Sequence, residues 1–344
     1  TFSSGMMEVA RSGIFHPQFF TLPELLTIFL AVMITDVILL DLFNTYGLPT
    51  STTVSVVFEL LGAAVALAML KLLTAGESLV NVVQYINSAK AITIIMGILL
   101  SVAIAFVCGA IVQFFTRLLF TFDYQKRIGR YGALWGGMAL ASITYFILVK
   151  GAKGATFISK QNQEWINTHT GLLLLLIFVV AAVVLQVLQL LKFNILKPVV
   201  LIGTFALAMA FAANDLVNFV GVPLAGLHAY RLAAASDDPL GITMGGLAAK
   251  VPSETFLLLL AGGVMVATLW LSKKARTVTE TEISLSQQEE GNERFESIFL
   301  SRAIVRLVLH LSDTVRLIIP QGVRGWIGRR LDPAAAAPVL VDGR

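Results

Sequence analysis

Seven apolar segments of 16 to 29 residues dominate this sequence. A helix needs about 20 apolar residues to cross the hydrocarbon core of a bilayer. Backbone N–H and C=O groups find no water there, so segments of this length adopt the helix, which satisfies its own hydrogen bonds. With 57% hydrophobic and 13% charged residues, the composition is far from that of a soluble domain. The sequence therefore predicts an all-α polytopic membrane protein. The segments lie at 23–42, 49–73, 91–119, 131–149, 172–191, 198–213 and 253–271.

The distribution of lysine and arginine predicts the orientation of these spans. Basic residues concentrate in the short loops at 126–130 and 192–197 and in the region after 272. The positive-inside rule places these parts in the cytoplasm, with Thr1 outside and the C-terminal region inside. The sixth span is expected to break around Asn214–Asp215 and to continue weakly past Pro223.

The region after residue 271 differs in composition from the spans. We divide the chain into a transmembrane region, 1–271, and a cytoplasmic region, 272–344. Residues 277–296 are polar and acidic, which favours a flexible linker. Residues 297–320 place charged side chains at steps of three or four between apolar ones, which is typical of an amphipathic helix. Such a helix suits either the cytoplasmic membrane surface or the transmembrane region's own inner face.

A polar stretch, 44–53, interrupts the first two apolar segments. Gly47 permits a tight break, and Pro49 suits the first turn of the next helix. Ser51, Thr52 and Thr53 then surround the positive end of that helix, where free N–H groups and the dipole favour an anion. The stretch has no lysine or arginine, so the positive charge for a multiply charged anion must come from elsewhere. The alternative is a helix–helix turn with ordinary hydroxyl packing.

Carboxylate and amide side chains within the apolar segments indicate an ion path or an aqueous cavity, because a charge in hydrocarbon is costly. Two pairs, Asp41 with Asn44 and Asp215 with Asn218, lie one helical turn apart, so each pair can present oxygens to one point. Oxygen ligands of this kind suit a hard cation such as Na⁺. Some of these acids, Asp41 foremost, could instead sit in water at helix ends. The residues concerned are Asp36, Asp41, Asn44, Glu59, Asn214, Asp215 and Asn218.

Two of these stretches carry a resemblance to a known family. Residues 213–221, Ala-Asn-Asp-Leu-Val-Asn-Phe-Val-Gly, resemble the G-A-N-D-x-x-N-x-x-G signature of the inorganic phosphate transporter (PiT) family. Residues 47–53, Gly-Leu-Pro-Thr-Ser-Thr-Thr, resemble its G-x-P-x-S-T-T element, and the combination is most similar to the long bacterial branch. Ala212 stands where a glycine is usual, and Val54 where a histidine is usual. The second departure removes a titratable group, so proton linkage assigned to that histidine is not carried over.

The resemblance implies two inverted repeats, each with one A-N-D element and one S-T-T element, and broken helices that meet at the midplane. This chain has one of each, S-T-T first, so we expect an internal fragment: the end of repeat one and the start of repeat two. The resemblance also implies that Ser51, Thr52 and Thr53 bind phosphate oxygens. Asn214, Asp215 and Asn218 would then bind the coupling cation.

The sequence is therefore interpreted as a secondary transporter that carries inorganic phosphate inward with Na⁺, with H⁺ as the second choice. A carrier of sulfate or another oxyanion is the main alternative. Asp41, and after it Glu59, are candidates for telling phosphate from sulfate, since a fixed carboxylate accepts a phosphate O–H and repels sulfate; Asn44 joins them as a coupling candidate.

A membrane enzyme is a more distant alternative, because the four histidines lack metal-ligand spacing, and a structural subunit is another distant alternative. Expected partners are phosphate, a coupling cation and lipid of the bacterial inner membrane. A homodimer stays open, and neither a cofactor, a resident metal nor nucleic acid is expected.

Overall fold

A computed structural model describes residues 13–122, 124–147, 160–248, 254–286 and 296–332. This part of the chain is helical, with two isolated β-bridges and no strand. The prediction of an all-α polytopic membrane protein is confirmed. The α-helices are α2 (Leu22–Tyr46), α3 (Thr52–Ala75), α4 (Val82–Tyr85), α5 (Ser88–Phe120), α6 (Tyr124–Tyr145), α7 (Lys160–Thr168), α8 (Thr170–Leu190), α9 (Leu196–Ala234), α10 (Thr255–Leu271), α11 (Lys273–Ser286), α12 (Phe299–Ile318) and α13 (Gln321–Arg330), with 3₁₀ turns η2 (Pro17–Phe19), η3 (Leu79–Asn81) and η5 (Met244–Ala248).

Among the described residues, five helices are long and apolar enough to cross a bilayer: α2, α3, α5, α8 and α9. A sixth candidate is the pair α10 and α11, which bends by 74° at its junction. The fourth predicted segment corresponds to α6, which begins at Tyr124 and so takes in the basic stretch predicted to be a loop. The loop prediction was wrong there. The division into seven spans stays a prediction.

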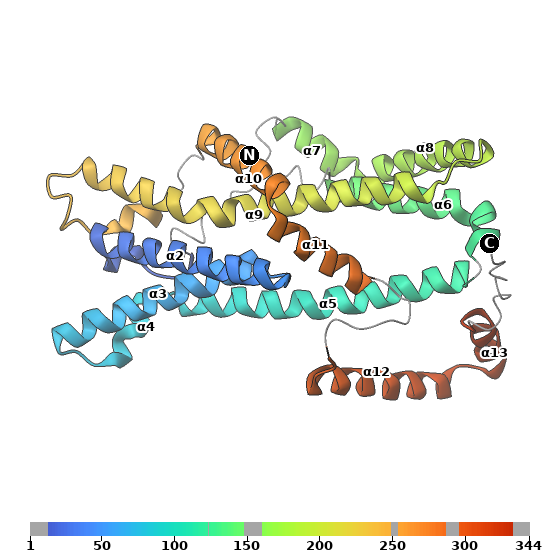
Figure 1. Cartoon of the computed structure of the whole chain (residues 1–344), viewed down its shortest axis with the longest axis horizontal. Coiled ribbons are helices and arrows are strands. Elements are labelled where there is room, and N and C mark those ends of the chain that lie inside the picture. The colour runs from blue at the N-terminus through green and yellow to red at the C-terminus, as the bar shows by residue number, and fades with distance from the viewer. Residues whose placement is uncertain (1–12, 123, 148–159, 249–253, 287–295, 333–344) are drawn as a thin grey trace.

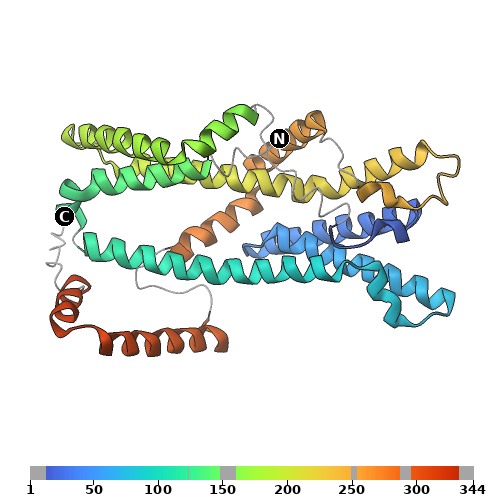
Figure 2. The same ribbon diagram turned by 180° about the vertical axis from the view of Figure 1, so that it is seen from behind.

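Helix α9 runs the length of the molecule and joins two groups of helices, as both views show (Figures 1 and 2). At one end it packs against α6, which lies along α8; at the other it packs against α2, α3 and η5. The 39-residue helix is continuous through Asn214 and Asp215 and contains Pro223 in its interior. The predicted break at Asn214–Asp215 was therefore wrong.

The main core lies where α2, α3 and α9 meet. On α2 the buried residues follow a helical stripe through Leu25, Phe29 and Val32. The facing stripe of α3 includes Leu60 and Ala64, and α9 contributes alanines and Val222 to the same cluster. Small side chains at such an interface let helix backbones approach closely, which strengthens packing inside a membrane where lipid removes the hydrophobic driving force.

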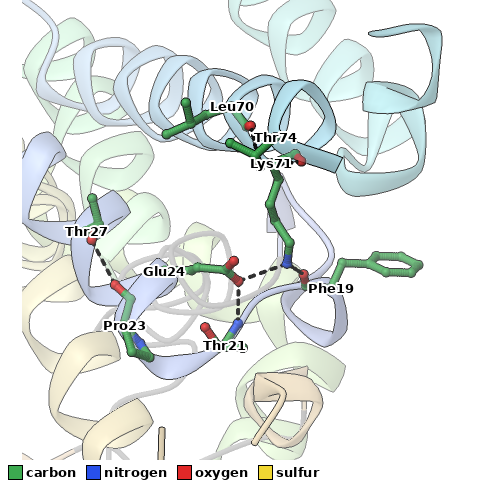
Figure 3. A network of polar contacts seen from close by, with 8 residues as sticks. All are labelled: Phe19, Thr21, Pro23, Glu24, Thr27, Leu70, Lys71 and Thr74. Carbon is green, nitrogen blue, oxygen red and sulfur yellow. Dashed lines mark hydrogen bonds and ion pairs between the residues drawn. The ribbon is translucent and has the colours of Figure 1, made fainter. Parts of the chain in front are cut away.

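The end of the α2–α3 hairpin farthest from its turn is closed by a polar network (Figure 3). Lys71 Nζ donates to the Phe19 carbonyl at 2.8 Å and to Glu24 Oε2 at 3.0 Å. The same Glu24 oxygen accepts the backbone N–H of Thr21 at 2.7 Å, as part of a capping box at the start of α2. The network gives Lys71 a charged partner, and it fixes the start of α2 beside the end of α3.

Helices α6 and α8 form the most extensive helix–helix interface of the described chain. Glycines at 132 and 136 are spaced as in a small-xxx-small motif, and both are buried. A Cβ atom built on Gly137 would lie 2.9 Å from Ala182 Cβ and 3.1 Å from the Ala182 backbone. Because the obstacle includes main chain, a side chain at residue 137 requires the two helices to separate.

We expect Gly137→Val to destabilise the α6–α8 pair by about 1–3 kcal/mol, the usual cost of overpacking. Gly109→Val in α5 is the matched control, since a Cβ on Gly109 meets no atom within 4 Å. Thermal unfolding of the purified protein in detergent measures the difference. Equal melting temperatures for the two variants would contradict the close α6–α8 approach.

The segment after α10 differs from the linker predicted at 277–296. Its first part is helical to Ser286, as α11, and packs against α2. The linker prediction was wrong for these residues, while 287–295 lie outside the described residues. The structure has α12 within the range predicted for an amphipathic helix, and its apolar residues, such as Phe299 and Leu307, are exposed. Its position on a membrane surface stays a prediction.

Candidate functional site

The turn between α2 and α3 is built by local chemistry. Gly47 adopts a left-handed conformation with φ 62° and ends α2, and Leu48 N–H donates to the Phe43 carbonyl at 2.8 Å. Ser51 is the N-cap of α3, and its hydroxyl accepts the Val54 N–H at 3.4 Å. Helix α3 begins at Thr52, so the placement of Pro49 in its first turn was wrong. Pro49 instead follows the glycine cap of α2, where a residue that cannot continue a helix is common.

Two threonines of this turn meet two polar residues of α9. The Thr52 hydroxyl donates to Asp215 Oδ1 at 2.8 Å. The Asn218 amide donates to Thr52 Oγ1 at 2.8 Å and to Thr53 Oγ1 at 2.9 Å. These four residues, Thr52, Thr53, Asp215 and Asn218, form what we call the hydroxyl–amide cluster. It joins the S-T-T element to the A-N-D element across 163 to 166 residues of sequence.

The hydrogen-bond inventory of the hydroxyl–amide cluster shows what it can still bind. A threonine hydroxyl has one donor hydrogen, and that of Thr52 is used by Asp215. Both amide hydrogens of Asn218 are used by the threonines, while its Oδ1 is buried and has no hydrogen-bond partner within the described chain. The residue is 2% exposed, so an acceptor oxygen is held in the interior without a donor.

The other predicted site residues lie outside the hydroxyl–amide cluster. Ser51 is exposed at the cap of α3. Asn214 is in α9, next to Asp215, but its side chain is outside what the structure describes. Asp41 lies on the exposed side of α2 and pairs with Lys274 at 2.6 Å. Glu59 Oε1 accepts the Ser55 hydroxyl at 2.6 Å, and Glu59 lies nearly two turns further into α3 than the cluster.

Asn44, one turn beyond Asp41, contributes its backbone carbonyl rather than its side chain to the described contacts. It accepts the Thr277 hydroxyl at 3.2 Å. A second α11 threonine, Thr281, is fully buried and donates to the Gly47 carbonyl at 2.7 Å. We call these two contacts, with the Asp41–Lys274 ion pair, the α11 clasp. The sequence analysis missed it, although Thr277 and Thr281 are spaced four residues apart, as helix neighbours on one face are.

We expect Thr281→Val to loosen the turn that carries the hydroxyl–amide cluster. The change keeps the shape of the side chain and leaves a buried carbonyl of Gly47 without its donor, at a cost of about 1–3 kcal/mol. Hydrogen exchange of the amides at 44–54 measures the effect, and faster exchange is expected. Thr279→Val is the control, because Thr279 is exposed and bonds only within its own helix. Equal protection in both variants would mean that the α11 clasp does not hold the turn in place.

A sequence model of the phosphate transporter family matches residues 1–282, which include the turn, α9 and most of α11. The chain belongs to the phosphate transporter family. Membership of this family implies a membrane transporter. The matched range ends within α11, so α12 and α13 lie beyond it.

Proteins described as candidate phosphate permeases in three archaea are similar to this transporter. Those of Pyrococcus abyssi and Thermococcus kodakarensis are each 26% identical over 324 residues, which is 89% of this chain and 70% of theirs. That of Pyrococcus furiosus is 25% identical over 323 residues, or 89% of this chain and 69% of its own. No solved structure matches the chain.

Proposed function

We propose that this protein is a secondary transporter that carries inorganic phosphate inward across the bacterial inner membrane, coupled to Na⁺. The observation that carries the proposal is the meeting of the S-T-T turn with Asp215 and Asn218 of α9. Family membership and the candidate phosphate permeases among its relatives support phosphate as the substrate.

The hydroxyl–amide cluster offers a physical route for coupling. Thr52 cannot donate to a phosphate oxygen while its hydrogen is held by Asp215. A cation bound at the Asp215 carboxylate competes for that oxygen and releases the hydroxyl. The cation then favours phosphate at the α3 N-terminus, and phosphate favours the cation in return, as thermodynamic linkage requires.

Oxygen chemistry favours Na⁺ as this cation. The Asp215 carboxylate and the unpartnered Asn218 Oδ1 are hard oxygen donors on neighbouring turns of α9. In this proposal Asn214 adds a further oxygen, and Ser51, Thr52 and Thr53 bind the phosphate. The cation supplies the positive charge that the 44–53 stretch lacks. Two inverted repeats, a cytoplasmic C-terminal region and the roles of Asp41, Asn44 and Glu59 in selectivity or coupling stay part of the proposal.

Uptake into proteoliposomes by the full-length protein tests the proposal. Radiolabelled phosphate should accumulate under an inward Na⁺ gradient and should accumulate much less under a K⁺ gradient of equal size. Unlabelled sulfate should compete more weakly than unlabelled phosphate. Equal competition by the two anions would make the protein a general oxyanion carrier, and equal uptake in Na⁺ and K⁺ would contradict Na⁺ coupling.

A further inference from the structure

Two carboxyl groups lie between α2 and α3, away from the hydroxyl–amide cluster. Asp36 is 8% exposed, and its Oδ1 has no hydrogen-bond partner among the described residues. Glu59 Oε1 accepts the Ser55 hydroxyl, while its buried Oε2 has no such partner. Glu24 and Lys71 form an ion pair across the same two helices, and Asp36 and Glu59 each lie twelve residues nearer the turn, so the two carboxyl groups lie at the same level of the α2–α3 interface. Each therefore presents one unsatisfied oxygen in the interior.

The surroundings of this pair are apolar. Asp36 continues the buried stripe of α2, one turn after Val32, and Glu59 lies between Val56 and Leu60 on α3. Neither carboxyl group takes part in an ion pair within the described chain. Two ionised carboxylates in such a site would be costly, because each loses hydration and repels the other.

Several charged groups on the helices packed around the pair have partners of their own or lie at another level along the helices. At the ends of the hairpin, Glu24 pairs with Lys71 and Asp41 pairs with Lys274. On α9, Asp215 accepts from Thr52. The buried His228 is two residues after Gly226 on α9, and Gly226 faces Leu26 and Phe29 of α2. Because Phe29 precedes Asp36 by seven residues, His228 lies at least roughly 10 Å along the helix axis from the level of Asp36. The remaining charged side chains of these helices are Lys197 and Arg231 on α9 and Lys273, Arg276, Glu280 and Glu282 on α11.

Coordination chemistry indicates which cation the pair takes. Hard metal ions bind to several oxygens at once, six or more for Ca²⁺ and Mg²⁺. The buried oxygens of the pair without a partner in the described chain are Asp36 Oδ1 and Glu59 Oε2, and the nearby Ser55 hydroxyl already donates to Glu59 Oε1. A proton needs only two oxygens, one to carry it and one to accept its hydrogen bond. Two carboxyl groups that cannot both ionise share a proton in this way.

We propose that Asp36 and Glu59 share one proton and form a proton-binding site in the α2–α3 interface, separate from the hydroxyl–amide cluster. We infer further that protonation of the pair accompanies the transport cycle. This part of the inference rests on the proposed phosphate transport. The site gives the chain a titratable group inside the membrane although Val54 occupies the position where the family usually has a histidine.

Infrared spectroscopy of the purified protein in lipid tests the proton site without any need for transport. A protonated carboxylic acid has a C=O stretching band that a carboxylate lacks. We expect this band near neutral pH in the wild type, in Na⁺ and in K⁺ buffers alike. It should disappear in Asp36→Asn/Glu59→Gln and should shift or weaken in each single variant. Asp41→Asn, which removes an exposed acid from the same helix, should leave it unchanged.

Three spectroscopic outcomes would overturn the proton site. The first is a band of equal intensity in the wild type and the double variant. The second is a band that Na⁺ abolishes and K⁺ restores, which would make the pair a Na⁺ site. The third is a change with Asp36→Asn but none with Glu59→Gln, which would mean a single acid rather than a shared proton. The substitutions preserve shape, and Gln retains an acceptor for Ser55; gel filtration and circular dichroism verify folding.

Uptake in proteoliposomes at a series of pH values adds a functional readout. The wild-type rate should vary with pH, and the double variant should show at least a severalfold weaker variation. An infrared band with no phosphate uptake would contradict the proposed function and support the proton site. Uptake with an unchanged pH profile and no band would contradict the proton site alone.

Discussion

Asp215→Asn should lower the affinity for Na⁺ by about tenfold or more, because it removes the charge of a cation ligand and keeps its shape. The asparagine oxygen still accepts the Thr52 hydroxyl, so the contact seen at 2.8 Å can persist. Phosphate affinity measured in Na⁺ should fall as well, by roughly 5–150-fold if the coupling has the usual strength. Phosphate affinity measured without Na⁺ should change little.

The difference between the two conditions is the decisive quantity in this experiment. Isothermal titration of phosphate into the purified protein, in NaCl and in choline chloride, provides both values. Asp237→Asn is the matched control, since Asp237 is an exposed acid in the loop after α9 and loses the same charge. An equal loss of phosphate affinity in both salts would place Asp215 at the anion or in folding, and not at the cation.

Thr52→Val is the second change with a large expected effect. It keeps the shape of the side chain and removes the hydroxyl that links Asp215 to Asn218. Asp215 and Asn218 each lose a hydrogen bond in a half-buried site, which costs about 1–3 kcal/mol. The site also loses a hydroxyl that can donate to phosphate. Phosphate affinity should therefore fall by roughly 5–150-fold.

Thr52→Ser distinguishes the loss of the hydroxyl from damage to packing, because serine keeps the hydroxyl and loses only a methyl group. Its phosphate affinity should stay within a few-fold of the wild type. Equilibrium binding of labelled phosphate measures both variants. If serine and valine at this position lowered affinity equally, the hydroxyl would have no part in binding.

Features that depend on neighbouring residues could be predicted from the sequence. The break at Gly47 follows from the conformational freedom of glycine, and the place of Ser51 at the positive end of α3 follows from the free N–H groups of a helix start. Both lie within a few residues of the groups they serve. The apolar segments likewise predict membrane helices without knowledge of what they pack against.

Features that depend on distant contacts could not be predicted in the same way. A break was expected at Asn214–Asp215, and Asp and Asn do disfavour helix interiors when their side chains bond to the nearby backbone. In the structure Asp215 and Asn218 bond to α3 instead, and α9 continues. Similarly, α11 is polar enough to suggest a linker, but the end of α2 provides partners for its threonines.

The α11 clasp also has a consequence for biosynthesis. The carbonyls of Asn44 and Gly47 accept hydrogen bonds from Thr277 and Thr281, which come 233 and 234 positions later in the chain. At about 5–20 residues per second, a ribosome needs roughly 10–50 s to make that intervening length. During this interval the α2–α3 hairpin is already made, yet the buried Gly47 carbonyl at its turn still lacks the Thr281 donor. A nascent chain that stops before Thr281 therefore leaves the hairpin unfinished, whatever the stability of α2 and α3 themselves.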